Sequence, residues 1–521
     1  MFVLNHNSVS IFNSMTLRNL LSVALAATIL VTFSASASAF RSEYSVTVKD
    51  TAAHLFHVKA EFSEIDQPSL DVQLPVWSPG WYTIENYAKN IVRFTVMGAS
   101  GDTLAHPMIH KSAWRIDTRR QKHITIEFDY LADLMALNQA ILSSEFGYFQ
   151  GTELFLEPIG HRDLPVRLHI KAPKEWTVIS PLIELSPDTY LPDELTVEAQ
   201  NYDELVDAPC EMGNLDVTQF NVDGKQHRLV VNPKHAYSQA EYDAFANHLE
   251  AIAIEEKKVF GELPYFQYVY FYIFRQNDTH ARGGLEHLSS HVGLTPMKPD
   301  SLIRQTGLAA HEFFHCWNVK RLRPAQMWPY DYSRDDESPL LWFSEGFTNY
   351  YGLICQYRAK LMDDTTFLKS LGSAILGVQS NPASSYTSPE DASTSTWNGY
   401  DTPQACGISY YGQGEVIAAV LDVMILQATQ GKARLDDVMK YMYDAQYKHG
   451  KGFTRTDFLA AVKKISGKDF TEFYNRYIAG AHPTDANTFR DVGMLFVDGK
   501  LVSDTGATTT QTALKQIWLK R

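Results

Sequence analysis

The chain has 521 residues, of which 45% are hydrophobic and 20% charged, a balance typical of globular proteins. It is too long for one ordinary hydrophobic core, so we expect two or three domains. The formal net charge of -14 disfavours nucleic-acid binding, which depends on clustered lysine and arginine. Four cysteines are too few for a disulfide framework, although a bridge between the last two stays open: Cys210, Cys316, Cys355 and Cys406.

Residues 1–39 have the pattern of a signal peptide. Arg18 precedes an apolar stretch over residues 20–33, and Ala37-Ser38-Ala39 gives a small-x-small cleavage site before Phe40. The apolar stretch is too short to span a bilayer comfortably, and no later run reaches the ~18 apolar residues that a spanning helix needs. We therefore expect an exported protein, periplasmic or extracellular, with no transmembrane segment in the mature chain.

Residues 40–217 alternate between apolar and polar side chains with the period of two that β-strands have. Residues 56–62 and 124–130 are examples, and turn clusters such as Gly98–Asp102 separate the strands. Many short strands of this kind predict a β-sandwich-like N-terminal domain. The segment Pro75–Tyr82 is rich in proline and aromatic residues, which favours a packed loop that either lines a cleft or belongs to the domain core.

Residues 218–400 change to a mixed α/β pattern, so the predicted fold class is multidomain α+β. A capping box of Ser238 and Glu241 begins an amphipathic helix, and strands follow over 268–274 and 284–288. Residues 380–400 are rich in Ser, Thr, Pro, Asn and Gly, which predicts a loop that lies over or beside the functional site. A helical part over 401–485 and a tail over 486–521 complete the chain, with helices expected over 411–429, 435–447, 456–465 and 471–478.

The string His311-Glu312-Phe313-Phe314-His315 is the most informative motif. In a helix its two histidines lie one turn apart on one face, where both can hold a single zinc ion. Glu312 then lies about 100° round the helix axis, beside the open zinc position. By chance such a string should arise about 0.04 times in a chain of this composition, so further evidence is needed.

Catalytic zinc sites usually take three protein ligands. Glu345 is the best third candidate, because it falls in an aromatic, apolar helix that Ser338-Pro339 is expected to begin, and a buried carboxylate needs a cation or hydrogen-bond partner. Asn349 is a possible supporting residue. One zinc held by this set would acidify a bound water and polarise a scissile carbonyl, and Glu312 would take the water's proton and pass it to the leaving amine.

The chain also resembles the glycyl aminopeptidase family of gluzincin metallopeptidases, from about Gln73 to Pro483. The resemblance implies a β-rich N-terminal domain and a thermolysin-like catalytic domain with a helical continuation. Five separate motifs in the expected order carry it: Trp77–Gly80, Gly283–His287, His311–Pro324, Leu341–Tyr351 and Ser409–Gly414.

The resemblance implies further site residues. Glu286 would bind the free α-amino group of the substrate, and Gly283 and Gly284 would let the substrate backbone approach the strand closely. Tyr411 would donate a hydrogen bond to the tetrahedral oxyanion, with Tyr410 as the alternative. Relatives often have Lys where Gln413 stands.

Several other residues near these motifs are not expected to take part in metal binding or catalysis. For the basic residues Lys320, Arg321 and Arg323 we expect structural roles, and we treat His280, His287 and His291 as non-ligands. After Pro483 the chain is too short for the PDZ domain that many family members carry, so we expect none.

We therefore expect an exported zinc aminopeptidase with one zinc ion per chain and peptides as substrates. The family name suggests N-terminal residues as small as Gly or Ala. The alternatives are a zinc endopeptidase, which Glu286 would argue against, and a peptide-binding envelope protein with a vestigial zinc site. Oligomeric state cannot be predicted from the sequence.

Overall fold

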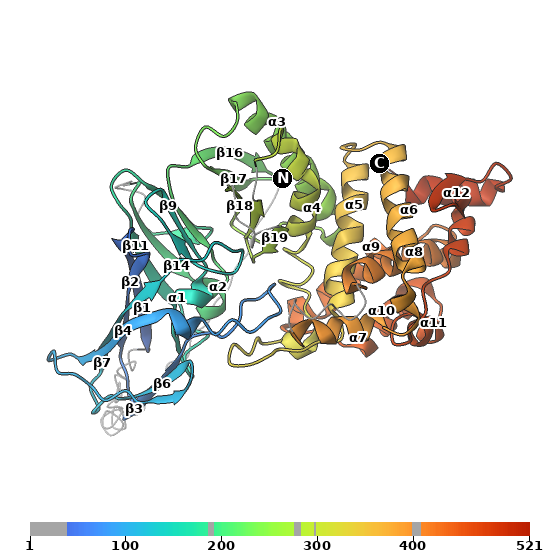
Figure 1. Ribbon diagram of the computed structural model, residues 1–521. Coiled ribbons are helices and arrows are strands. Elements are labelled where there is room, and N and C mark those ends of the chain that lie inside the picture. Colours follow the sequence, from blue (N-terminus) through green and yellow to red (C-terminus); the bar gives the residue numbers. More distant parts are fainter. Residues whose placement is uncertain (1–38, 186–191, 276–282, 296–297, 399–407, 521) are drawn as a thin grey trace, which may run out of the picture. The chain divides into compact units, whose positions relative to one another are not determined.

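The computed structural model describes residues 39–185, 192–275, 283–295, 298–398 and 408–520. Residues 40–521 form one compact unit, which is β-rich at its N-terminal end, mixed α/β in the middle and helical at its C-terminal end (Figure 1). This is the predicted α+β class. The signal-peptide prediction falls on residues outside those described, and the predicted domain boundaries stay predictions.

The largest sheet of the N-terminal region has the strand order β13-β14-β11-β1-β2-β7-β4. Within it β1 pairs with β11 in parallel, and the other neighbours are antiparallel. Every second residue of β2 is buried, which confirms the predicted alternation. The strands are β1 (Arg41–Asp50), β2 (Leu55–Ser63), β4 (Ile91–Gly98), β7 (His123–Leu131), β11 (Val166–Lys171), β13 (Ile183–Glu184) and β14 (Glu194–Ala199).

Two smaller sheets, ordered β10-β3-β6-β5 and β12-β15-β9-β8, complete this region. The segment Pro75–Tyr82 follows β3 as a loop, as predicted, and Trp77 and Tyr82 within it are fully buried. The elements are β3 (Ser69–Gln73), β5 (Met108–His110), β6 (Ala113–Asp117), β8 (Ile141–Leu142), β9 (Phe146–Phe149), β10 (Glu157–Pro158), β12 (Thr177–Ile179), β15 (Cys210–Gly213), α1 (Gly151–Leu154) and α2 (Tyr202–Val206).

The central sheet has the order β16-β17-β18-β20-β19, so β19 is an edge strand. All eight residues of β18 are buried because both faces of the sheet are covered. Tyr268, Tyr270 and Tyr272 belong to the main core, and Val269, Phe271 and Ile273 to a second cluster that includes N-terminal residues such as Leu137. The strands are β16 (Asp216–Val222), β17 (Lys225–Asn232), β18 (Gln267–Phe274), β19 (Gly283–Glu286) and β20 (Ser290–Thr295).

Helix α3 (Gln239–Phe260) begins at the predicted capping box and ends at Gly261, whose φ of 89° suits a glycine. Helix α4 (Thr306–Phe314) carries the His-Glu-x-x-His motif. The next helical stretch departs from expectation, because Trp342–Phe347 (η4) is π-helical before α5 (Thr348–Arg358) continues as a regular α-helix. Single π turns are frequent at functional sites.

The C-terminal helices agree with the predicted spans: α8 (Tyr410–Thr429), α9 (Leu435–Ala445), α10 (Arg455–Ser466) and α11 (Thr471–Tyr477). The loop predicted for residues 380–400 is wrong. After α6 (Asp364–Ser380), that stretch forms short helical turns and α7 (Pro389–Ser395), which begins at a capping box of Ser388 and Asp391. Residues 399–407 lie outside the described residues.

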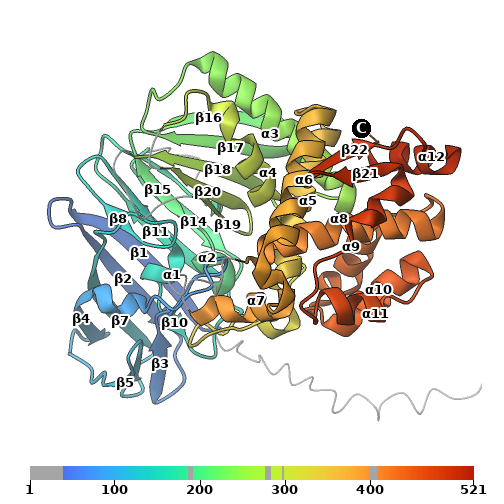
Figure 2. The same cartoon turned by 45° about the vertical axis from the view of Figure 1, so that its right-hand side comes forward.

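The C-terminal segment is folded. The hairpin of β21 (Met494–Val497) and β22 (Lys500–Ser503) packs on α6, and α12 (Thr509–Trp518) packs on α8 (Figure 2). The described residues include no helix that is both long and apolar enough to cross a membrane. Cys210, Cys316 and Cys355 are buried, whereas Cys406 lies outside the described residues, so the proposed Cys355–Cys406 bridge stays open.

Candidate metal centre and catalytic site

Helix α4 brings the two motif histidines together. His311 lies in its last turn and His315 is the residue that caps its C-terminus. Their Nε2 atoms are 3.0 Å apart, and their rings meet edge to face with centroids 4.7 Å apart. The local spacing in sequence therefore places two ring nitrogens at one point.

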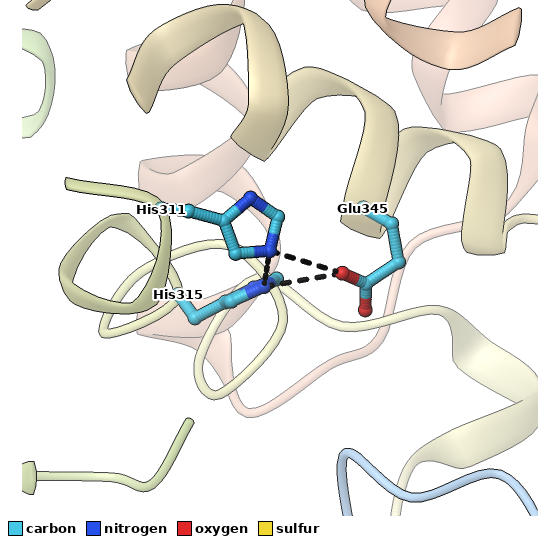
Figure 3. A group of neighbouring side chains, drawn as sticks. All are labelled: His311, His315 and Glu345. Carbon is cyan, nitrogen blue, oxygen red and sulfur yellow. Dashed lines mark hydrogen bonds and ion pairs between the residues drawn. The ribbon is translucent and has the colours of Figure 1, made fainter. Parts of the chain in front are cut away.

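Glu345, from the π-helical segment η4, supplies the third group (Figure 3). Its Oε2 lies 3.5 Å from Nε2 of His311 and 3.2 Å from Nε2 of His315. Ligand atoms placed ~2.1 Å from a tetrahedral zinc ion lie about 3.4 Å from one another, so these three atoms have the spacing of zinc ligands.

The second polar atoms of this group are held by other residues, which fixes its orientation. Nδ1 of His315 lies 2.6 Å from the main-chain oxygen of Asn318, so this nitrogen donates a hydrogen bond and Nε2 is the ring nitrogen that faces the cluster. Oε1 of Glu345 accepts a hydrogen bond of 2.9 Å from the hydroxyl of Tyr82. The remaining atoms, Nε2 of His315 and Oε2 of Glu345, are therefore left facing each other at the candidate metal site.

The electrostatics of the cluster follow from burial and close charges. Burial alone would lower the pKa of His315, but the Glu345 carboxylate and its acidic neighbours raise it to about 10. Burial would raise the pKa of Glu345, yet the adjacent imidazoles hold it below its usual range. The pKa of His311 is lowered, chiefly by burial. A carboxylate that stays charged beside two imidazoles is the donor set that zinc prefers.

Glu312 points from α4 toward the edge strand β19. A Cβ on Gly284 would lie 2.2 Å from Oε1 of Glu312, so only glycine leaves room for this carboxylate. We expected Gly284 to make room for a substrate; its close neighbour in the structure is Glu312. Burial raises the pKa of Glu312 well above its usual range, as expected for a carboxyl group that exchanges protons near neutral pH.

Glu286, at the end of β19, lies within the same cluster. One oxygen of Glu286, one of Glu312 and one ring nitrogen of His315 lie within 4.8 Å of one another. Glu286 is 4% exposed, and its Oε1 has no hydrogen-bond partner among the described residues. Its carboxylate packs against Gly80 of the N-terminal loop, where a Cβ would lie 2.7 Å from Oε2. A buried carboxylate oxygen without a partner is suited to a cationic ligand.

Both candidate tyrosines reach this centre from the start of α8. The ring of Tyr411 stacks on that of His311, with centroids 6.1 Å apart. Tyr410 is fully buried, and its hydroxyl lies 3.5 Å from that of Thr396. The two helical stretches meet through glycines, since a Cβ on Gly346 would lie 2.2 Å from Cα of Gly414. Tyr410 and Tyr411 therefore both remain candidates for the oxyanion hydrogen-bond donor.

Sequence reasoning missed the residues that support the cluster from elsewhere in the chain. The side-chain amide of Asn318 donates to the main-chain oxygens of Phe343 and Ser344 in η4 and to the hydroxyl of Thr348, each at 3.1 Å. Asn318 therefore joins the turn after α4 to the segment that carries Glu345, and a supporting role of Asn349 stays a prediction. Asn318 lies within the His311–Pro324 motif and Tyr82 ends the Pro75–Tyr82 loop, but neither residue was given a role from the sequence.

The basic and histidine-rich residues make structural contacts, as the sequence analysis favoured. Arg321 donates to the main-chain oxygens of Leu288, Cys316 and Pro264, and Arg323 to those of Val319, Lys320 and Met327. His287 contacts Asp207, and His291 lies between two tyrosine hydroxyls. His280 lies outside the described residues.

Comparisons with known proteins agree with this geometry. Residues 43–214 match the model of the peptidase M61 N-terminal domain, and residues 304–417 match that of the M61 glycyl aminopeptidase. The chain is 26% identical to an aminopeptidase N family protein from Idiomarina loihiensis, with a TM-score of 0.80 over 87% of this chain and 78% of that one.

More distant structures share the fold. An M1 zinc metallopeptidase from Deinococcus radiodurans has a TM-score of 0.51 at 12% identity, over 82% of this chain and 90% of that one. Yeast LTA4 hydrolase has a TM-score of 0.55 at 11% identity, over 87% and 70%. No curated protein matches the chain.

The class of the protein follows from these findings: it is a zinc metallopeptidase, a hydrolase of peptide bonds. The two matched models describe parts of one peptidase family and together span more than half of the chain. The chain belongs to the M61 glycyl aminopeptidase family.

Proposed function

We propose that the protein is an exported aminopeptidase that removes N-terminal residues from peptides, with one zinc ion held by His311, His315 and Glu345. The observation that carries the proposal is the buried Glu286 carboxylate, which lies within reach of Glu312 and His315 and has one oxygen without a hydrogen-bond partner among the described residues. A carboxylate at this place provides a fixed point for a substrate ammonium next to the catalytic group.

Binding precedes chemistry. The α-ammonium of the substrate pairs with Glu286, so the first peptide bond comes to lie beside Glu312 and the predicted metal ligands. A fixed anchor of this kind sets the distance from the amino terminus to the scissile bond, which favours removal of a single residue. Glu286 and Gly80 lie in contact, so the Pro75–Tyr82 loop limits the space beyond the Glu286 carboxylate.

Glu312 acts as the general base and then as the general acid. Bound zinc supplies a Lewis acid that polarises the scissile carbonyl and acidifies the attacking water. The Glu312 carboxylate takes the proton of that water and delivers it to the nitrogen of the leaving amine. The raised pKa of Glu312 suits it to both halves of this transfer.

Tyr411 is the favoured donor of a hydrogen bond to the oxyanion of the tetrahedral intermediate, with Tyr410 as the alternative. Tyr411 is only partly buried and stacks on His311, whereas Tyr410 is fully buried beside Thr396. Replacing each tyrosine by phenylalanine separates the two roles, because loss of the oxyanion donor lowers kcat about 100-fold or more.

Substrate preference and location complete the proposal. The family name and the loop that packs on Glu286 favour N-terminal Gly or Ala. Arg18, the apolar stretch over 20–33 and the Ala37-Ser38-Ala39 site favour export with cleavage before Phe40. Sequencing the amino terminus of the protein from the cell envelope tests this, and an uncleaved cytoplasmic product would contradict it.

Metal analysis combined with hydrolysis of unblocked amino-acid amides tests the activity. The native chain should contain one zinc ion and hydrolyse glycine and alanine amides, whereas Glu312→Gln should keep the zinc and lose turnover. Zinc with no hydrolysis of any peptide would favour the alternative of a vestigial peptide-binding protein.

Glu286→Gln distinguishes an aminopeptidase from an endopeptidase. The variant should lose activity on unblocked substrates, with matched N-acetylated peptides as the control. If the variant cleaved both the unblocked and the N-acetylated peptides at the native rate, Glu286 would not be an amine anchor. The protein would then be better explained as an endopeptidase.

A further inference from the structure

Asp207 is a buried carboxylate that joins three segments around the proposed amine anchor. It caps the C-terminus of α2 in the N-terminal region. Its oxygens accept hydrogen bonds from the main-chain amide of Leu288 at 2.7 Å and from the Nζ of Lys320 at 2.7 Å, and lie 3.3 Å from Nδ1 of His287. His287 and Leu288 directly follow Glu286.

Lys320 is the cation in this group, and its side chain is 1% exposed. Its second contact is the main-chain oxygen of Pro79, at 3.4 Å. The next residue, Gly80, packs directly against the Glu286 carboxylate. The ammonium of Lys320 and the carboxylate of Glu286 therefore contact adjacent residues of one short loop.

Three groups on different segments lie close enough to act on the charge of Lys320. Asp207 is its ion-pair partner, and Tyr330 and Glu286 also lie close enough to act on its charge. Although burial alone would lower the pKa of Lys320, Asp207 raises it, and Lys320 in turn holds the pKa of Asp207 below its usual range. Both groups are thus charged at neutral pH.

A buried ammonium near Glu286 is a potential competitor of the substrate. Within the part of the chain that the structure describes, one oxygen of Glu286 has no hydrogen-bond partner, so a neighbouring cation that is free to move would occupy it. In the structure Lys320 is instead bound to Asp207 and to the Pro79 oxygen. The ion pair leaves the open oxygen of Glu286 to a ligand.

We propose that Asp207 is a positioning residue that holds Lys320 away from Glu286, so that Glu286 stays available for the α-ammonium of the substrate. This inference rests on the proposed aminopeptidase function. Asp207 itself does not touch the substrate; it acts through Lys320.

The test compares Asp207→Asn with the double variant Asp207→Asn, Lys320→Met, using alanine p-nitroanilide as the probe. In the single variant Lys320 loses its partner and pairs with Glu286, so KM should rise about 10–100-fold while kcat changes little. In the double variant the competing cation is gone, so KM should return to within about threefold of the native value. Zinc content should stay the same in both.

Two outcomes would overturn the inference. If the double variant kept the high KM, Asp207 would act only by holding the end of β19. If Asp207→Asn lowered kcat without raising KM, the amine site would not be the one affected. A native chain that fails to hydrolyse the probe would instead refute the proposed function, which separates the two failures.

If Asp207→Asn does not fold, the single variant Lys320→Met tests the inference instead. Asp207 then retains the Leu288 amide and His287 as partners, and the variant lacks the competing cation. Its KM should equal or fall below the native value. A tenfold rise in KM at unchanged kcat would show that Lys320 itself supports amine binding, and would contradict the proposal.

Discussion

The hydroxyl of Tyr82 donates a hydrogen bond of 2.9 Å to Oε1 of Glu345, although 263 positions separate the two residues in the chain. Tyr82 ends the aromatic loop of the N-terminal region, and Glu345 lies in the π-helical segment. Burial first, and the nearby carboxylates in addition, raise the pKa of Tyr82 well above its usual range, so it stays a donor. The N-terminal region thus completes the surroundings of the candidate metal centre.

Tyr82→Phe should weaken zinc binding. Without the donor, the Glu345 carboxylate is no longer held in its orientation toward the two histidines, and partners of metal ligands typically contribute about 10–100-fold in affinity. Competition with a chelator measures the zinc dissociation constant directly.

Tyr87→Phe is the matched control, because Tyr87 is also fully buried and its hydroxyl bonds Ser78 rather than a predicted ligand. Equal zinc affinities for Tyr82→Phe and Tyr87→Phe would remove any special role of the Tyr82 contact.

Gly414→Ala should destabilise the protein strongly. A Cβ at this position would lie 2.0 Å from the main-chain oxygen of Trp342, and neither backbone can move without shifting α8 away from η4. Overpacking of this kind costs about 1–3 kcal/mol or more in the free energy of unfolding. Gly412→Ala, two residues earlier on the same helix, meets only one side chain, at 4.0 Å, and should be neutral or stabilising. Denaturant unfolding of both variants checks this; similar losses would contradict the packing argument.

The metal cluster could be predicted because most of its geometry is local. The four-residue spacing of His311 and His315 in a helix fixes their common face, and Glu345 stood out as a carboxylate among buried aromatic side chains. Its π-helical setting could not be foreseen, because it depends on Asn318, which bonds two main-chain oxygens of η4 from another segment.

The supporting residues could not be predicted, because tertiary packing alone brings them to the site. Tyr82 and Asp207 lie far from the zinc motif in sequence, and neither was singled out by itself, although Tyr82 ends the loop that we expected to line a cleft or belong to the core. The failed loop prediction for 380–400 has a different cause: Ser388 and Asp391 form a capping box inside a stretch whose composition suggests a turn. For the C-terminal tail we predicted no fold; in the structure, buried residues such as Trp518 anchor it.

Stability should fall with rising pH because of Glu211. This carboxyl group is fully buried, and burial raises its pKa to about 7 in the folded protein, above its unfolded value of 4.5. A raised folded pKa contributes stability that is fully present below pH 4.5 and is lost as pH rises through about 7. Between pH 5.5 and 8.5 the loss from this group is about 2 kcal/mol.

Glu211→Gln should remove that loss, since glutamine cannot ionise yet can still accept the hydrogen bond from Asn232. Its stability relative to the native chain should therefore be higher at pH 8.5 than at pH 5.5. Glu175→Gln, at an exposed position, is the control. Denaturant midpoints at the two pH values decide the matter; an equal pH dependence in Glu211→Gln and the native chain would be the contrary result.

Trp518→Ala should loosen the C-terminal segment from the helical region. Trp518 is fully buried, and its Nε1 donates to the hydroxyl of Tyr350 on α5 at 3.0 Å. Truncation of a buried tryptophan costs about 3–5 kcal/mol, partly from the cavity that remains. Gln516→Ala, exposed on the same helix, should cost little. Thermal unfolding and proteolysis of α12 measure both variants. An unchanged melting temperature would mean that α12 is not held by this contact. Because α5 directly follows the segment that carries Glu345, Trp518→Ala should also release zinc more readily.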